Sequence, residues 1–140
     1  MPDEHTSIYP TTFYRVSIKA AIRNDKGEVL VNKEYDATTW SLPGGGLDHG
    51  ETDKEAMARE LFEEVGYSGE FTASPIATET FWLESKQAWL LWIVYDIEPN
   101  NSNFSVGADS SEIAFIDPNQ FRNSDSRAEQ WIYRHLRIDA

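Results

Sequence analysis

The segment from Gly45 to Tyr67 constrains this chain more than any other part of the sequence. It reads GGLDHGETDKEAMARELFEEVGY, a glycine turn followed by a run of helix-forming residues. Glu60, Glu63 and Glu64 are spaced so that all three carboxylates lie on one face of a helix. Like charges on one face repel each other, so the pattern indicates that a cation binds there. Hard divalent cations prefer oxygen ligands of this kind.

The helix that carries these carboxylates is predicted to run from about Asp53 to Val65. Thr52 or Asp53 can cap its start, and Gly66 suits a left-handed conformation at its end. Because successive helical residues are rotated by roughly 100°, five apolar side chains form one broad stripe that can pack on a sheet. They are Met57, Ala58, Leu61, Phe62 and Val65. The acidic stripe lies beside this apolar stripe and is expected to face a cleft.

A surface helix with a solvated acidic face is the ordinary alternative for a glutamate-rich sequence. The residues ahead of the helix argue against that alternative. The run LPGGG at residues 42–46 follows a short apolar stretch that includes Trp40. Consecutive glycines allow unusual backbone conformations and close approach to a ligand, and their carbonyls can bind a hard cation. We therefore expect a binding site where this turn meets the acidic face.

The segment resembles the Nudix box, G-x5-E-x7-R-E-U-x-E-E-x-G-U, in which U is a bulky apolar residue. The fixed positions are filled without a gap by Gly45, Glu51, Arg59, Glu60, Leu61, Glu63, Glu64, Gly66 and Tyr67. The stretch from Trp40 to Gly44 extends the resemblance upstream. Asp48 stands where many family members have glutamate, but that position of the box is variable. So many fixed positions at fixed spacing make the resemblance specific.

The resemblance implies a hydrolase that uses Mg²⁺ or Mn²⁺ to cleave nucleoside diphosphates linked to another group. Carried over by position, the metal ligands would be Glu60, Glu63, Glu64 and the Gly44 carbonyl. Arg59 is expected to pair with a box glutamate, and Glu51 to hold the loop against the helix or to bind metal through water. Glu64 is a candidate general base. Metal ions neutralise pyrophosphate oxygens and lower the pKa of a bound water, which explains these residue types.

A further carboxylate is expected from residues 109–112, because many Nudix proteins carry an acidic residue just before a strand with an aromatic side chain, here Phe115. Glu112 is the first choice for this metal ligand or general base, and Asp109 is the second. A solvated loop carboxylate is the alternative for both residues. Since the family does not use one fixed base, Glu64 and Glu112 both remain candidates for the general base.

Three residues are candidate substrate contacts. Lys33 ends the strand before the box loop, where Nudix proteins often place a basic residue that binds phosphate. Arg15 could belong to a basic row on the first strand, and Trp82 could stack on a base because aromatic faces do so. Ordinary solvent exposure is the alternative for Lys33 and Arg15. Trp89 and Trp92 are expected to lie largely in the core.

The rest of the chain predicts an α/β fold. Strands are expected near residues 13–22, 29–33, 70–83, 88–97 and 113–116, and a last helix near 126–138. The last helix would be anchored by Trp131, Ile132, His135 and Leu136. The pattern predicts a central mixed sheet between helices, an α/β/α sandwich like that of the Nudix fold. Residues 1–10 are expected to form a tail, and 11–140 a single domain.

Composition agrees with a compact enzyme. A chain of 140 residues fits one domain, and the absence of cysteine excludes disulfides and thiolate metal sites. The net charge of −12 argues against a broad surface for nucleic acid, so no nucleic-acid partner is expected. No apolar run approaches a membrane span, and the N-terminal sequence lacks the regions of a signal peptide. A cytoplasmic location and no membrane partner are therefore expected.

Three other protein classes compete with a pyrophosphate hydrolase as interpretations of this sequence. One is a catalytically silent Nudix-fold module that binds nucleotides, although such modules usually have a broken box. A prenyl diphosphate isomerase on a related fold relies on a cysteine, which this chain lacks. An acidic metal-binding interaction domain would show no turnover. A small-molecule nucleotide is the expected partner, with a nucleoside triphosphate or nucleotide sugar as the default substrate, and a homodimer stays open.

Overall fold

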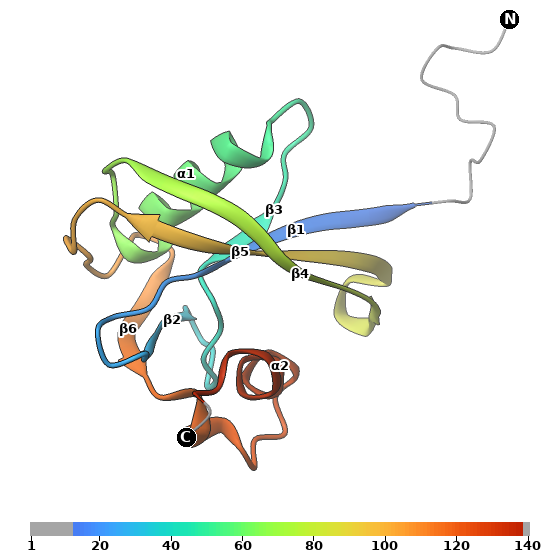
Figure 1. Ribbon diagram of the computed structural model, residues 1–140. Helices are drawn as coiled ribbons and strands as arrows, with labels where there is room; N and C mark the ends of the chain where they lie inside the picture. The colour runs from blue at the N-terminus through green and yellow to red at the C-terminus, as the bar shows by residue number, and fades with distance from the viewer. Residues whose placement is uncertain (1–12, 139–140) are drawn as a thin grey trace, which may run out of the picture.

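The computed structural model describes residues 13–138 of the chain and has the predicted α/β architecture. A mixed sheet of four strands lies at the centre, with helix α1 on one face and helix α2 on the other (Figure 1). The predicted tail, residues 1–10, lies outside the described residues. Among residues 13–138, no helix has both the length and the apolar character that crossing a membrane requires.

The central sheet has the strand order β3-β1-β5-β4. Its strands are β1 (Tyr14–Ala21), β3 (Gly44–Gly46), β4 (Phe71–Leu83) and β5 (Ala88–Pro99). β1 runs parallel to β5, and the other two pairs are antiparallel. A short 3-10 turn, η1 (Glu84–Lys86), joins β4 to β5. The register places Gly44 beside Lys19, so the glycine turn itself forms an edge strand of the sheet.

A second, two-stranded sheet pairs β2 (Val29–Glu34) with β6 (Ser110–Ile116) and lies on the side of α2 (Figure 1). The sequence predicted both strands but not their separation from the central sheet. β2 is buried over its first four residues, which is why its apolar run does not alternate. The turn η2 (Pro118–Phe121) leads from β6 towards α2.

Helix α1 (Asp53–Val65) has the predicted bounds. Thr52 caps its start, where its side chain accepts from the Glu55 amide and the Glu55 side chain accepts from the Thr52 amide. Gly66 ends the helix in the left-handed region at φ 63°. Both ends of the helix were therefore encoded locally.

The buried face of α1 differs from the predicted apolar stripe. Ala58 and Phe62 are exposed, the latter by 61%. Ala56, Glu60 and Glu64 are buried with the rest of the stripe. The buried face of the helix therefore includes Glu60 and Glu64, because the space beside the glycine turn accommodates their two carboxylates. A purely apolar stripe would have left both carboxylates exposed.

Helix α2 (Arg127–Leu136) covers the other face of the sheet and buries Trp131, Ile132 and Leu136. The prediction that His135 also anchors this helix is wrong, because His135 is exposed and stacks on Trp131 with ring centroids 4.4 Å apart. Trp89 was also expected in the core but is 45% exposed, because it lies next to the turn that joins β4 to β5, at the end of the hairpin. Two apolar cores result, one under each helix.

Candidate functional site

The C-terminal half of α1, the glycine turn, the end of β2 and a loop border an open acidic cavity of about 370 Å³. Five carboxylates line it, together with Tyr35, Gly44 and Gly45; they are Glu34, Glu60, Glu63, Glu64 and Asp109. No cationic side chain is among the lining residues. So many like charges around one space are unfavourable unless a cation or a proton offsets them.

Glu64 is the most deeply buried carboxylate of this group, with 2% of the residue exposed. Its Oε2 accepts a 2.9 Å hydrogen bond from the Gly44 amide, and its Oε1 a 3.4 Å bond from the Asn32 side chain. Burial raises the pKa of Glu64 to about 7, although Lys19 and the Gly44 amide oppose that rise. A carboxylate with this pKa can exchange a proton near neutral pH.

Arg59 holds the other box carboxylates in a network. Its guanidinium donates two 2.8 Å hydrogen bonds to the two carboxylate oxygens of Glu51, a bidentate arrangement. It also donates to Glu60 at 2.9 Å and to Glu63 at 3.4 Å. The bonds from Arg59 and the Asp48 amide hold the pKa of Glu51 at about 2, whereas burial raises the pKa of Glu60 despite Arg59. Arg59 therefore fixes the rotamers of its neighbours, as the resemblance implied.

Gly44 can only be glycine in this fold. Its φ is 145°, and a Cβ there would lie 1.9 Å from the Ile18 carbonyl oxygen. The carbonyl oxygen of Gly44 lies 3.4 Å from the Lys19 Nζ. Next to it, a Cβ on Gly45 would collide with the Glu60 carboxylate. The turn thus lets backbone and carboxylates share a space that side chains would fill.

The cavity fits a hard divalent cation in its chemistry, since its lining offers only oxygen ligands from five carboxylates, a tyrosine and backbone. Within residues 13–138, no three acidic or histidine side chains converge closely enough to hold a metal ion together as they stand. The contacts of Arg59 explain this, because they draw Glu60 and Glu63 towards its guanidinium. A metal bound by Glu60, Glu63 and Glu64 would have to compete with Arg59.

The structure brings Asp109, rather than Glu112, to the cavity. Glu112 pairs across the second sheet with Lys33, with the Lys33 Nζ 3.4 Å from a carboxylate oxygen. Lys33 also lies over the Trp40 ring, 4.6 Å from its centroid. Neither Lys33 nor Glu112 is among the residues that line the cavity. The register of β2 and β6 pairs Glu112 with Lys33, and the register shift between Lys33 and Glu34 leaves Ser110, rather than Glu112, opposite Glu34.

Arg15 and Trp82 lie at the other end of the central sheet. The Arg15 guanidinium packs against Gly46, the last residue of the glycine strand. Trp82 is 40% exposed and forms a row of rings with Trp89 and Tyr14 across three strands, with centroids 6.2 and 5.9 Å apart. This aromatic row does not line the acidic cavity, so any substrate that touches both must extend along β1.

Sequence reasoning missed Tyr35, which lines the cavity, and two further contributors to the site. Glu34 lines the cavity from the end of β2, and its position directly after a buried strand was a usable signal. Asn32 is fully buried beside Glu64, and a polar residue inside the run VLVN was the signal there. Neither residue belongs to the box, so the motif alone could not point to them.

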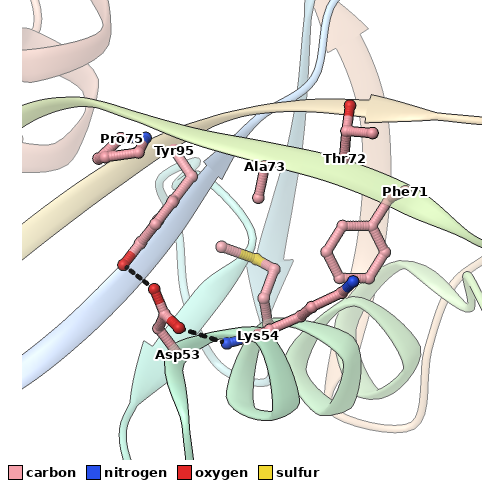
Figure 2. Close-up of a pocket in the computed structure, with 8 residues that line it drawn as sticks. Asp53, Lys54, Phe71, Thr72, Ala73, Pro75 and Tyr95 are labelled. Carbon is pink, nitrogen blue, oxygen red and sulfur yellow. Dashed lines mark hydrogen bonds between the residues drawn. The ribbon is translucent and has the colours of Figure 1, made fainter.

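A second cavity of about 390 Å³ lies at the opposite end of α1, between its first turn and strands β4 and β5 (Figure 2). Its lining is mixed, with Phe71, Met57 and Pro75 beside Asp53 and Lys54. The Tyr95 hydroxyl donates a 2.8 Å hydrogen bond to Asp53. Burial and this bond raise the pKa of Tyr95 to about 12. The bond ties the start of α1 to the sheet, and none of the carboxylates of the acidic cavity lies here.

A profile of the NUDIX domain matches residues 13–136, which is most of the chain. The chain belongs to the NUDIX domain family. This confirms the resemblance drawn from the box and extends it from that segment to the whole described fold.

Solved NUDIX structures confirm the fold. The MutT protein from Methanosarcina mazei Go1 superposes with a TM-score of 0.72 at 24% identity, covering 88% of this chain and 92% of that one. The MutT NUDIX hydrolase from Burkholderia pseudomallei gives 0.73 at 22% identity, covering 89% and 99%. At such identities the likeness concerns the fold alone.

Curated relatives of this NUDIX chain include proteins named RNA pyrophosphohydrolase. The one from Vibrio atlanticus (strain LGP32) is 41% identical over 73 residues, which is 52% of this chain and 42% of the relative. The one from Actinobacillus succinogenes is 51% identical over 53 residues, covering 38% and 27%. The chain thus spans less than half the length of these two relatives.

Proposed function

We propose that this NUDIX protein hydrolyses a pyrophosphate bond in a nucleoside diphosphate linked to another group, with Mg²⁺ or Mn²⁺ as cofactor. One observation carries the proposal. The complete box folds so that five carboxylates line a single cavity beside the glycine turn, with Glu64 buried at its base. This arrangement repels a bare anion, so an anionic substrate needs cations between itself and the protein.

The metal would be held by Glu60, Glu63 and Glu64, with the Gly44 carbonyl as a further oxygen ligand. A bound divalent cation supplies charge neutralisation for the pyrophosphate and a more acidic water. The protein supplies the positions of these oxygens. Arg59 holds Glu60 and Glu63 through one guanidinium nitrogen, at 2.9 and 3.4 Å, and would release them to a bound cation. Glu51 holds Arg59 from the other side and so acts on the site indirectly.

Glu64 is the strongest candidate for the general base. Its buried carboxylate lines the cavity, and burial raises its pKa to about 7 in the metal-free protein, a value that a bound cation would lower. Asp109 also lines the cavity and can hold a metal or a water there. The role predicted for Glu112 requires its exposed side chain to leave Lys33 and reach the cavity. Glu63, Glu64 and Arg59 would form the catalytic set, and Glu112 remains a candidate fourth member.

Three residues outside the cavity are proposed to contact substrate. Lys33 lies on the strand beside Glu34 and would reach a phosphate if it left Glu112. Arg15 packs against the glycine strand and would meet a phosphate that extends along β1. Trp82, exposed in the aromatic row, would stack on a base. The row favours a substrate longer than a mononucleotide.

The relatives named RNA pyrophosphohydrolase suggest the 5′ end of an RNA as one such substrate. The net charge of −12 argues against a long polyanion, because such a ligand gains little from an acidic surface. A silent nucleotide-binding module is the competing function. We propose a cytoplasmic location, which agrees with the absence of a membrane-spanning helix among residues 13–138.

A hydrolysis screen tests the proposal. Nucleoside triphosphates, nucleotide sugars, dinucleoside polyphosphates and a 5′-triphosphorylated RNA oligonucleotide are incubated with Mg²⁺ or Mn²⁺, and the products are identified. Activity should disappear with a chelator. In Glu63→Gln it should fall on the order of 10²-fold or more, by analogy with lost metal or acid–base assistance. Binding of nucleotides without turnover on any substrate would favour the silent module, and full activity without metal would eliminate the mechanism.

A further inference from the structure

Asn32 joins four segments of the site although it lies outside the box. It is fully buried on β2, and its backbone amide and carbonyl pair with Ser41 at 2.9 and 3.0 Å. Ser41 precedes the glycine turn, so this pairing fixes where the turn begins. The side chain of Asn32 reaches in another direction, to α1 and to the start of β6.

The Asn32 amide nitrogen donates to the Ser110 hydroxyl at 3.0 Å and to the Glu64 Oε1 at 3.4 Å. The Gly44 amide donates to the other oxygen of Glu64 at 2.9 Å. The carboxylate is therefore held at both oxygens by N–H groups from two different segments. A buried carboxylate held in this way has few rotamers left.

The second polar atom of Asn32 has no partner, since its Oδ1 is buried and accepts no hydrogen bond. An unsatisfied buried acceptor costs on the order of 1–3 kcal/mol. The three residues before it on β2 are Val29, Leu30 and Val31, which are all buried and apolar. An apolar side chain at position 32 would avoid this cost, so stability alone does not account for asparagine here. The hydrogen bond that Asn32 donates to Glu64 accounts for asparagine at this position.

We propose that Asn32 is a positioning residue that holds the Glu64 carboxylate in the orientation its chemistry requires. This inference rests on the proposed function of the acidic cavity. Groups that orient a metal-binding or proton-transferring side chain typically affect metal affinity or activity by about 10–100-fold. Asn32 acts through Glu64 and does not line the cavity itself.

The test compares Asn32→Leu, which keeps the volume and removes the donor, with Ser110→Ala, which removes only the other partner of Asn32. The dissociation constant for Mn²⁺ alone is measured by calorimetry, and kcat and KM on the substrate that the screen identifies. In Asn32→Leu we expect Mn²⁺ affinity or kcat to fall by about 10–100-fold, with KM changed less than about threefold. Ser110→Ala should stay within about threefold of the native protein on every measure.

A double-mutant cycle separates positioning from a general structural effect. If Asn32 acts through Glu64, adding Asn32→Leu to Glu64→Gln should cause little further loss of kcat. An equal loss in both backgrounds would overturn the inference. Thermal melts check folding, and the isosteric Asn32→Asp, which places a second carboxylate beside Glu64, replaces Asn32→Leu if the latter does not fold. A folded Asn32→Asp with native Mn²⁺ affinity and kcat would also overturn it.

The two proposals can fail separately. A native protein that binds Mn²⁺ but hydrolyses nothing would refute the proposed function, and the Mn²⁺ affinities of the Asn32 variants would still decide the inference. A native protein that binds no Mn²⁺ would refute both. Native activity with native-like Asn32→Leu would refute the positioning role alone.

Discussion

Replacing Glu64 with glutamine should stabilise the metal-free protein, and the gain should grow with pH. The pKa of Glu64 rises on folding from its ordinary value of 4.5 to about 7, chiefly because the carboxylate is buried. The folded state therefore binds a proton at Glu64 more tightly than the unfolded chain does. The stability that this proton contributes is complete below pH 4.5 and is lost as pH rises towards 7.

The magnitude follows from that pKa. At roughly 1.4 kcal/mol per pKa unit, ionised Glu64 costs the folded state about 3 kcal/mol above pH 7 and about 1 kcal/mol at pH 5. Glutamine has no charge to desolvate. Its carbonyl can accept from the Gly44 amide, and its amide can donate to the Asn32 Oδ1 after that side chain turns over, which moves the unpartnered position of Asn32 from Oδ1 to Nδ2. Glu64→Gln should therefore fit the same space.

The assay is urea unfolding at several pH values between 5 and 8.5, with a chelator present. Glu64→Gln should exceed the native protein by about 1 kcal/mol at pH 5 and about 3 kcal/mol at pH 8.5, equivalent to a Tm increase of roughly 6–12 °C at the higher pH. The matched control is Glu63→Gln, which removes the same formal charge from a side chain that is 35% exposed. This control should not reproduce a gain of that size.

Two outcomes would refute the reasoning. One is a Glu64→Gln variant that is less stable than the native protein at pH 8.5. The other is a gain that does not change with pH, since it could not come from the carboxylate. Saturating Mg²⁺ should reverse the order, because a ligand that binds the native site stabilises only the protein that retains it.

The remaining predictions concern residues 107–112. Gly107→Ala should destabilise the fold by about 1–3 kcal/mol. A Cβ at this position would lie 2.2 Å from the Glu63 carbonyl oxygen. The clash would push the loop away from α1 and break the 2.9 Å hydrogen bond that the Asp109 amide donates to the same oxygen. Thermal melts beside the exposed control Ala108→Ser measure this, and equal Tm values would contradict it. Asp109→Asn should lower kcat more than Glu112→Gln at saturating Mg²⁺, since only Asp109 lines the cavity. The opposite order, with KM unchanged, would favour Glu112 as the base.

The local features of the site could be predicted from the sequence because short-range physics sets them. The helix from Asp53 to Val65 has its cap residues and its turn glycine within the same segment, so neighbours in the chain decide both ends. The spacing of Glu60, Glu63 and Glu64 fixes their common face for the same reason. Three strands of the central sheet, β1, β4 and β5, were also predicted to within a few residues, whereas the short strand β3 in the glycine turn was not predicted.

Only the tertiary structure decided which carboxylates meet. Asp109 reaches the cavity because its loop pairs with the last carbonyls of α1, whereas Glu112 is turned towards Lys33 by the register of β2 and β6. Asn32 and Glu34 are brought beside α1 from a strand that lies about 30 residues away in the chain. Such contacts depend on how two sheets and a helix pack, and no local pattern carries that information. The motif therefore determined the kind of chemistry, and the packing determined the partners and the burial that tune Glu64.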